Sequence, residues 1–160
     1  MSERPVRILF VCLGNICRSP TAEALFAELA ARCGFADKVE VDSAGTGSWH
    51  VGEPPDPRAA EAAAARGVSL RGRARQVEPA DFNRFDWLVA MDRSVLRSLQ
   101  RLAPDERARA KVRLLPGELE VPDPYYGPAD GFKRVLDILE AGCEALLAEV
   151  LGEVAQNRSR

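Results

Sequence analysis

Residues 7–34 read RILFVCLGNICRSPTAEALFAELAARCG, and this stretch decides the fold. Its first part, residues 7–11, is a short apolar run rich in strand formers, and it predicts a β-strand. After the loop CLGNICRS, Ser19 is expected to cap a helix that has Pro20 at its first position and ends at Gly34. A strand joined to a helix by a short loop is the first half of a parallel α/β unit.

Strand and helix patterns continue to alternate along the rest of the chain. Strands are predicted at residues 39–42, 87–91 and 112–115, and helices at 59–66, 93–102 and 132–150. The fold class is therefore predicted to be α/β: an open four-stranded parallel sheet with helices on both faces, in a single domain over residues 1–160. The polar residues 152–160 are expected to fray. Ligands of such sheets bind beyond the carboxyl ends of the strands.

The composition excludes several classes of protein. The 22 Lys and Arg nearly balance the 24 Asp and Glu, so no basic surface for nucleic acid or for a membrane is expected. No apolar run is long enough to span a bilayer, and the first residues lack the pattern of a signal peptide, so the protein is expected to be cytoplasmic. The four cysteines and the single histidine have no spacing typical of a zinc site. Neither a metal nor an organic cofactor is expected, because the chain itself can supply the reacting groups described below.

The loop between the first strand and the first helix is suited to binding an anion. It places five residues between Cys12 and Arg18, enough to wrap around a tetrahedral anion with backbone N–H groups turned inward at a helix N-terminus. Gly14 lets the backbone come close, and Asn15 tolerates a left-handed conformation. Arg18 supplies a planar fork for two phosphate oxygens. The same positive field favours the thiolate of Cys12, which we therefore predict to be the nucleophile in phosphate ester hydrolysis.

Expelling an alkoxide or a phenoxide from phosphorus requires a proton donor. Four aspartates lie near the expected carboxyl edge of the sheet. Asp92 is expected to cap a helix, Asp56 to shape a loop between two prolines, and Asp42 to close a strand. Asp123 is followed by Pro124 and two tyrosines, which could form a slot for an aromatic leaving group. The residues alone leave Asp123 and the other three as alternatives.

Four stretches together resemble the low-molecular-weight protein tyrosine phosphatases. They are CLGNICRSPTAEA (12–24), SAGTGSWHVGEPPDPRA (43–59), FDWLVAMD (85–92) and DPYYGP (123–128), in the order in which that family has them. The likeness runs from about residue 6 to about residue 150. It implies an enzyme that hydrolyses phosphotyrosine in protein substrates, and small aryl phosphates, through a phosphocysteine intermediate, and that releases inorganic phosphate.

The resemblance also implies a role for each matching residue. Cys12 is similar to the nucleophile, Arg18 to the phosphate-binding arginine and Asp123 to the general acid and base. The positions that support the loop are Leu13, Gly14, Asn15, Ile16, Cys17 and Ser19, with Ser43 as the partner of Asn15, and those that wall the substrate pocket are Trp49, Tyr125 and Tyr126. One departure is Gly72, which stands where eukaryotic members often carry a histidine and removes a hydrogen-bond partner from this support.

Three other functions would use a similar loop. An arsenate reductase needs a further thiol on the central segment, and no cysteine occurs between Cys33 and Cys143. An arginine phosphatase tends to have threonine at the position of Ile16 and one aromatic residue in its acid loop, so Ile16 and the tyrosine pair favour phosphotyrosine. A non-catalytic phosphopeptide-binding module would not need both a nucleophile and an acid.

The remaining reactive side chains have simpler predictions. Cys17 lies inside the loop and is expected to form a reversible disulfide that protects Cys12 from overoxidation. Cys33 and Cys143 lie on apolar helical faces and are expected in the core. His50 is expected on the surface of a loop.

Overall fold

One sheet of four parallel strands, in the order β2-β1-β3-β4, organises the protein. The computed structural model describes residues 4–117, 120–125, 127–128 and 130–158, with side chains up to residue 153. The strands are β1 (Val6–Cys12), β2 (Val39–Gly45), β3 (Trp87–Ala90) and β4 (Val112–Leu114). The helices are α1 (Arg18–Arg32), η1 (Ala36–Lys38), α2 (Pro57–Ala64), α3 (Asp81–Arg84), α4 (Arg93–Leu102), α5 (Glu106–Arg109) and α6 (Gly131–Arg158). The predicted four-stranded parallel sheet is confirmed.

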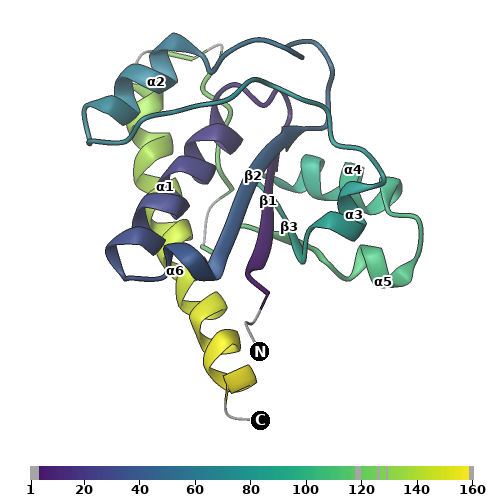
Figure 1. Cartoon of the computed structure of the whole chain (residues 1–160). Helices are drawn as coiled ribbons and strands as arrows, with labels where there is room; N and C mark the ends of the chain where they lie inside the picture. Colours follow the sequence, from purple (N-terminus) through teal and green to yellow (C-terminus); the bar gives the residue numbers. More distant parts are fainter. Residues whose placement is uncertain (1–3, 118–119, 126, 129, 159–160) are drawn as a thin grey trace.

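Helices cover both faces of the sheet, as Figure 1 shows. Successive side chains of β1 point to opposite faces. Ile8 and Phe10 pack into a cluster with α1 and α6, whereas Leu9 and Val11 pack into a second cluster with α3, α4 and α5. All four side chains have no exposed surface, which explains why this strand is an unbroken apolar run.

The carboxyl ends of the parallel strands meet at one edge of the sheet, at the top of Figure 1. Cys12 pairs there with Gly45, the last residue of β2, and the backbone N–H of Met91 donates to the carbonyl of Val11. The loops that follow β1, β2 and β3 therefore converge where a ligand site is expected.

The start and end of α1 differ from the prediction. The helix begins at Arg18, with Cys17 at the N-cap and no side-chain cap bond, so Ser19 is not the cap. The Ser19 hydroxyl instead forms hydrogen bonds with Cys12 Sγ and with Nδ2 of Asn15, both in the preceding loop. Cys33 is exposed, since the helix ends at Arg32 and Cys33 lies beyond the face that packs on the sheet. The prediction of a core position was correct for Cys143 and wrong for Cys33.

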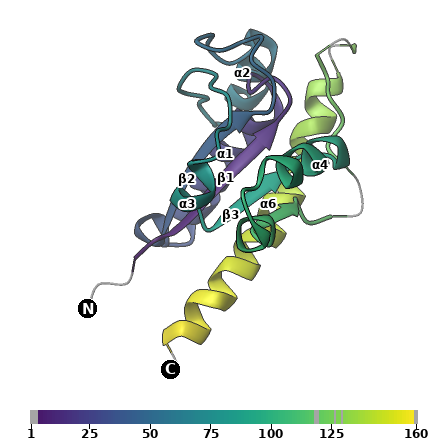
Figure 2. The same ribbon diagram turned by 90° about the vertical axis from the view of Figure 1, so that its right-hand side faces the viewer.

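The C-terminal helix is longer than the sequence predicted. α6 continues to Arg158, although a frayed tail was predicted from residue 152. Residues 152–158 contain several good helix formers and no proline, so the last turns of the helix can propagate. Figures 1 and 2 both show α6 running past the sheet, toward the side on which the N-terminus lies.

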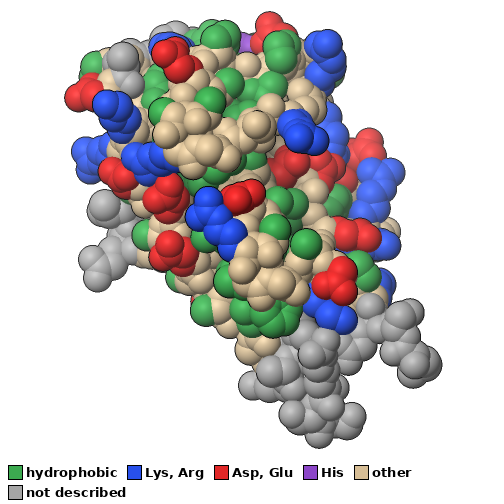
Figure 3. Space-filling view, turned by 60° about the vertical axis from the view of Figure 1, so that its left-hand side comes forward, with side chains coloured by type: hydrophobic (Ala, Val, Ile, Leu, Met, Phe, Trp, Pro, Cys, Tyr) green, Lys and Arg blue, Asp and Glu red, His purple; other side chains and the backbone are tan. Residues whose placement is uncertain are grey.

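The surface shown in Figure 3 carries basic and acidic side chains intermixed, with no field of one sign. This distribution agrees with the near-zero net charge of the chain. Within the part of the chain that the structure describes, none of the helices has the length and apolar character needed to cross a bilayer.

Candidate active site

A cavity of about 320 Å³ opens at the carboxyl edge of the sheet, beside the end of β1. A volume of this size suits a small ligand. The described residues that line it come from the loops after β1 and β2 and from the segment before α6: Cys12, Leu13, Gly14, Ile16, Cys17, Arg18, Trp49, His50, Asp123 and Tyr125. Tyr126, which the sequence assigned to the same wall, lies outside the described residues. Three segments far apart in the sequence thus converge on one thiol.

The thiol of Cys12 lies at the base of this cavity and is almost fully buried. Its sulfur accepts a hydrogen bond from the backbone N–H of Asn15 at 3.2 Å and shares a second one with the hydroxyl of Ser19 at 3.0 Å. These two contacts tie the sulfur to the loop and to the start of α1.

A buried asparagine holds the loop in shape. Asn15 has a φ of 58°, the left-handed conformation that the sequence predicted. Its Nδ2 donates to Ser19 Oγ at 2.8 Å and to Ser43 Oγ at 3.0 Å, and its Oδ1 accepts from the backbone N–H of Arg75 at 2.9 Å. With both ends of the amide bonded, the loop is tied to α1, to β2 and to the segment before α3.

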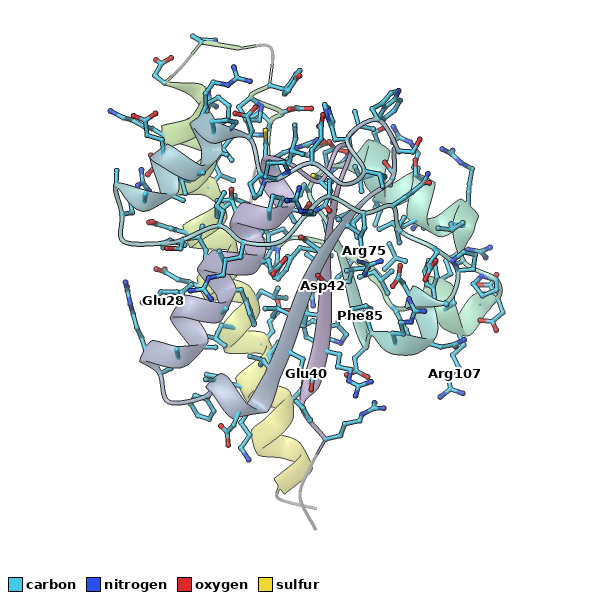
Figure 4. All side chains as sticks on the ribbon, turned by 45° about the horizontal axis from the view of Figure 1, so that its top comes forward. Glu28, Glu40, Asp42, Arg75, Phe85 and Arg107 are labelled. Atoms are coloured by element: carbon cyan, nitrogen blue, oxygen red, sulfur yellow. The ribbon has the colours of Figure 1, made fainter. Side chains whose placement is uncertain are left out.

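The hydrogen bonds that hold Asn15 and Ser43 form without a side chain at position 72. Ser43 Oγ donates to Glu23 Oε1 at 2.7 Å, and burial raises the pKa of the Glu23 carboxyl. Arg75, whose backbone holds Asn15, is itself anchored by ion pairs with Asp42 and Asp81; Figure 4 shows Arg75 beside Asp42. Glu23 and the Arg75 backbone were missed because nothing in the local sequence marks them as partners of the loop.

The guanidinium of Arg18 lies at the cavity with only 3% of its side chain exposed. Its Nη1 donates to Asp92 Oδ2 at 2.6 Å and to the carbonyl of Val121 at 3.0 Å, and its Nη2 lies 3.5 Å from Asp123 Oδ2. Burial alone would lower the pKa of Arg18, but the nearby Cys12 and the two carboxylates together raise it above its usual value. The arginine is thus charged and held in a fixed orientation.

Asp92 has two functions in the structure, of which the sequence predicted one. Its Oδ1 accepts from the backbone N–H of Val95 at 2.8 Å, so the predicted helix cap is confirmed. Its Oδ2 holds Arg18, a contact that the sequence analysis missed. The sequence could have indicated this contact, because Asp92 lies two residues after β3, at the same edge of the sheet as Cys12.

The other acid candidates are now distinguishable. Asp56 caps α2, and the hydrogen bond from Arg58 lowers the pKa of its carboxyl. Asp42 pairs with Arg75 and does not line the cavity. Asp123 lines the cavity, and its Oδ1 accepts from the backbone N–H of Tyr125 at 3.1 Å. Of the four aspartates, only Asp123 faces the cavity.

An aromatic wall flanks the cavity, and it includes a residue that the sequence placed elsewhere. Trp49 is 71% exposed, and Tyr125 lies across from the loop. His50 lies in a loop and is partly exposed, as predicted, but the sequence did not show that its ring lines the cavity 5.6 Å from the Tyr125 ring and bonds to Glu53. A Cβ on Gly14 would lie 3.0 Å from His50 Cδ2, so glycine leaves room for this ring.

The second thiol of the loop has a different environment. Cys17 is buried, and burial, together with the nearby Asp56 carboxylate, raises its pKa far above that of a free thiol. A thiol with such a pKa is a poor nucleophile at neutral pH. Among the described residues, no group of three or more His, Cys, Asp and Glu side chains is arranged to hold a metal ion.

A loop that carries a cysteine and an arginine at the carboxyl edge of a parallel sheet is typical of phosphatases with a cysteine nucleophile. Comparison with known proteins shows to which family of such phosphatases the chain belongs. Residues 7–157 match the family model described as low molecular weight phosphotyrosine protein phosphatase. The chain belongs to this family, which places it among the phosphoric monoester hydrolases.

Individual relatives agree with this assignment. A low molecular weight protein-tyrosine-phosphatase of Streptomyces coelicolor is 50% identical over 156 residues, covering 92% of this chain and 95% of the relative. A low molecular weight phosphotyrosine protein phosphatase of Sus scrofa is 40% identical over 157 residues, covering 94% and 99%. The crystal structure of a protein tyrosine phosphatase from Entamoeba histolytica superposes with a TM-score of 0.88 at 39% identity, covering 92% of this chain and 98% of that one.

Proposed function

We propose that the protein hydrolyses phosphotyrosine in protein substrates through a phosphocysteine intermediate on Cys12. The observation that carries this proposal is the convergence of a buried thiol, a charged arginine and a carboxyl group on one cavity. The family assignment and the aromatic wall of Trp49 and Tyr125 support an aryl phosphate as the ligand.

The geometry supports a two-step reaction. In the first step Cys12 Sγ attacks phosphorus while Arg18 and backbone N–H groups of the loop stabilise the charge on the transferring oxygens. Asp123 gives its proton to the leaving phenolic oxygen as the P–O bond breaks. In the second step the same carboxylate takes a proton from water, which attacks phosphorus and expels Cys12 as a thiolate. Inorganic phosphate leaves, and the hydrogen bonds from Asn15 and Ser19 stabilise the returning thiolate.

The role of Asp123 can be tested with a series of aryl phosphates of rising phenol pKa. Asp123→Asn is expected to lower kcat/KM for phosphotyrosine by about 10²–10⁴-fold, because a tyrosine phenolate leaves poorly without a proton. The loss in kcat/KM should be much smaller for nitrophenyl phosphate, whose leaving group is already a tolerable anion. A plot of log kcat/KM against phenol pKa should therefore become steep in the variant.

Asp92→Asn is the matched control for this series. It removes the negative charge that contacts Arg18, and its amide oxygen can still cap α4. Its overall rate should fall, but its dependence on phenol pKa should stay that of the wild type. A steep dependence in Asp92→Asn and not in Asp123→Asn would show that the acid has been assigned to the wrong residue.

We also propose that Cys17 protects the nucleophile during oxidation. Peroxide converts the Cys12 thiolate to a sulfenic acid, and the Cys17 thiol then displaces water to form a Cys12–Cys17 disulfide. Because burial raises the pKa of Cys17, its reactive thiolate becomes more populated as pH rises. The rate of disulfide formation should therefore keep rising through pH 9, where an ordinary thiol levels off.

Quenched-flow labelling with mass spectrometry measures this rate, and thiol reduction should restore activity. In Cys17→Ser the same peroxide dose should carry Cys12 to the irreversible sulfinic acid. Finding sulfinic acid on Cys12 at the same rate in both proteins would contradict a protective role.

Two broader properties complete the proposal. We infer that residues 1–160 form a single domain, since the two larger hydrophobic clusters pack on the two faces of one sheet. We also infer a cytoplasmic location, which agrees with four cysteines that are all free thiols.

A further inference from the structure

Arg58, in the first turn of α2, lies between the anion loop and the segment that carries Asp123. Its Nη2 donates to the carbonyl of Tyr125 at 3.0 Å and to Asp56 Oδ2 at 2.9 Å. Its guanidinium carbon lies 5.5 Å from the centre of the Tyr125 ring and 4.8 Å from that of Phe132. One side chain thus contacts both the backbone and the ring of Tyr125.

The Tyr125 backbone transmits this contact to the acid. The N–H of Tyr125 donates to Asp123 Oδ1 at 3.1 Å, so the residue whose carbonyl Arg58 holds is the one that orients the carboxyl group of Asp123. The side chain of Asp123 is 42% exposed. Its orientation therefore depends on a few hydrogen bonds more than on packing.

The other end of this connection is the anion loop. The backbone N–H of Asp56 donates to the carbonyl of Ile16 at 2.8 Å, and the carboxylate of Asp56 is hydrogen-bonded to Arg58. A continuous path of hydrogen bonds thus joins Ile16 to Asp123 through Asp56, Arg58 and Tyr125. Such a path fixes the distance between the nucleophile and the proton donor, which proton transfer in the transition state requires.

We propose that Arg58 is a positioning residue that holds Asp123 at the correct distance from the phosphate bound in the loop. The inference rests on the proposed role of Asp123 as the general acid. Arg58 acts through hydrogen-bond geometry, since 44% of its side chain is exposed and water screens its charge at the reacting atoms. A planar guanidinium suits this position because it can bond to a carboxylate and to a carbonyl while it stacks on two rings.

The decisive experiment is a double-mutant cycle. Arg58→Met keeps an unbranched stem against the two rings and removes the side-chain hydrogen bonds to Asp56 and to the Tyr125 carbonyl. It should lower kcat/KM for phosphotyrosine between about 10-fold and 10²-fold and steepen the dependence of log kcat/KM on phenol pKa. In the Asp123→Asn background the same substitution should change kcat/KM less than about twofold, because the group that it positions is absent.

Arg66→Met is the matched control. Arg66 also joins the α2 region to α6, through Glu140, Asp137 and the carbonyl of Lys133, but it does not contact Tyr125. The melting temperature of this variant should fall about as far as that of Arg58→Met. Its rate and its dependence on phenol pKa should stay those of the wild type. Arg58→Lys retains one donor for the Tyr125 carbonyl, and it should recover part of the wild-type phenol dependence.

The outcomes separate this inference from the proposed function. A loss of rate in Arg58→Met that is equal in both backgrounds, or an unchanged phenol dependence, would show that Arg58 only stabilises the fold. A wild-type phenol dependence in Asp123→Asn would instead overturn the assignment of the acid itself, whatever Arg58 does.

Discussion

Replacing Cys12 by serine is expected to abolish turnover and to leave phosphate binding largely intact. The serine oxygen can occupy the position of Sγ, which contacts Asn15 N–H and the Ser19 hydroxyl, but an alcohol is a far weaker nucleophile than a thiol. The loss in kcat should be on the order of 10³-fold or more, as is common when a nucleophile is removed. Steady-state hydrolysis of a phosphotyrosine peptide and calorimetric titration with inorganic phosphate measure the two effects.

Cys33→Ser is the control for this substitution, because Cys33 is exposed and lies at the far end of α1 from the cavity. It should keep the wild-type rate. Rapid acid quenching of the wild type during turnover should trap a phosphoryl group on Cys12, and the serine variant should trap none. Turnover within about tenfold of wild type in Cys12→Ser would contradict covalent catalysis by this residue.

The architecture was predictable because each strand has a local signature. The apolar run at β1 is buried on both faces, so its composition alone indicates a central parallel strand. The alternation of strands and helices then limits the topology to a parallel sheet, and parallel strands bring their carboxyl-end loops to one edge. The sequence also placed the loop of residues 12–18 at the cavity, since Cys12, Gly14 and Arg18 lie close together at the end of the first strand.

What the sequence missed concerns side chains whose contacts a local pattern does not show. Ser19 has the residue type and position of a helix cap, but its hydroxyl bonds to Cys12 and Asn15, and α1 begins without it. His50 has the neighbours of a surface loop, and only the fold brings its ring beside Tyr125. A local pattern cannot distinguish these alternatives, because a tertiary contact outweighs a single cap.

The sequence indicated Asp123 itself but not the residues that contact it. The sequence favoured Asp123 through the rigid proline and the aromatic residues that follow it. The contacts that orient it come from Arg18, 105 positions earlier, and from Arg58 through Tyr125, a separation of 67 residues. Arg58 also sits at the start of an alanine-rich helix, where an arginine is unremarkable. Its contacts become visible only once α2 is seen beside the segment before α6.

Replacing Arg18 by lysine is the second substitution with a large expected effect. The guanidinium donates to Asp92 and to the Val121 carbonyl, residues 74 and 103 positions away, and still directs Nη2 toward the cavity. A lysine ammonium is a single point charge and cannot make these contacts while also gripping two phosphate oxygens. We therefore expect kcat/KM to fall by about 10²-fold to 10³-fold, although the positive charge is kept.

Two measurements separate this loss from a loss of fold. Arg113→Lys is the control, since Arg113, like Arg18, pairs with a carboxylate, but its partner is Glu149 and its guanidinium lies over Trp87, neither of which lines the cavity. It should keep the wild-type kcat/KM. The rise in melting temperature that phosphate causes should be smaller in Arg18→Lys than in either the wild type or Arg113→Lys, because bound phosphate loses a two-pronged partner. If Arg18→Lys costs less than tenfold in kcat/KM, about 1.4 kcal/mol, then the fork geometry does not stabilise the transition state and a positive charge alone is sufficient.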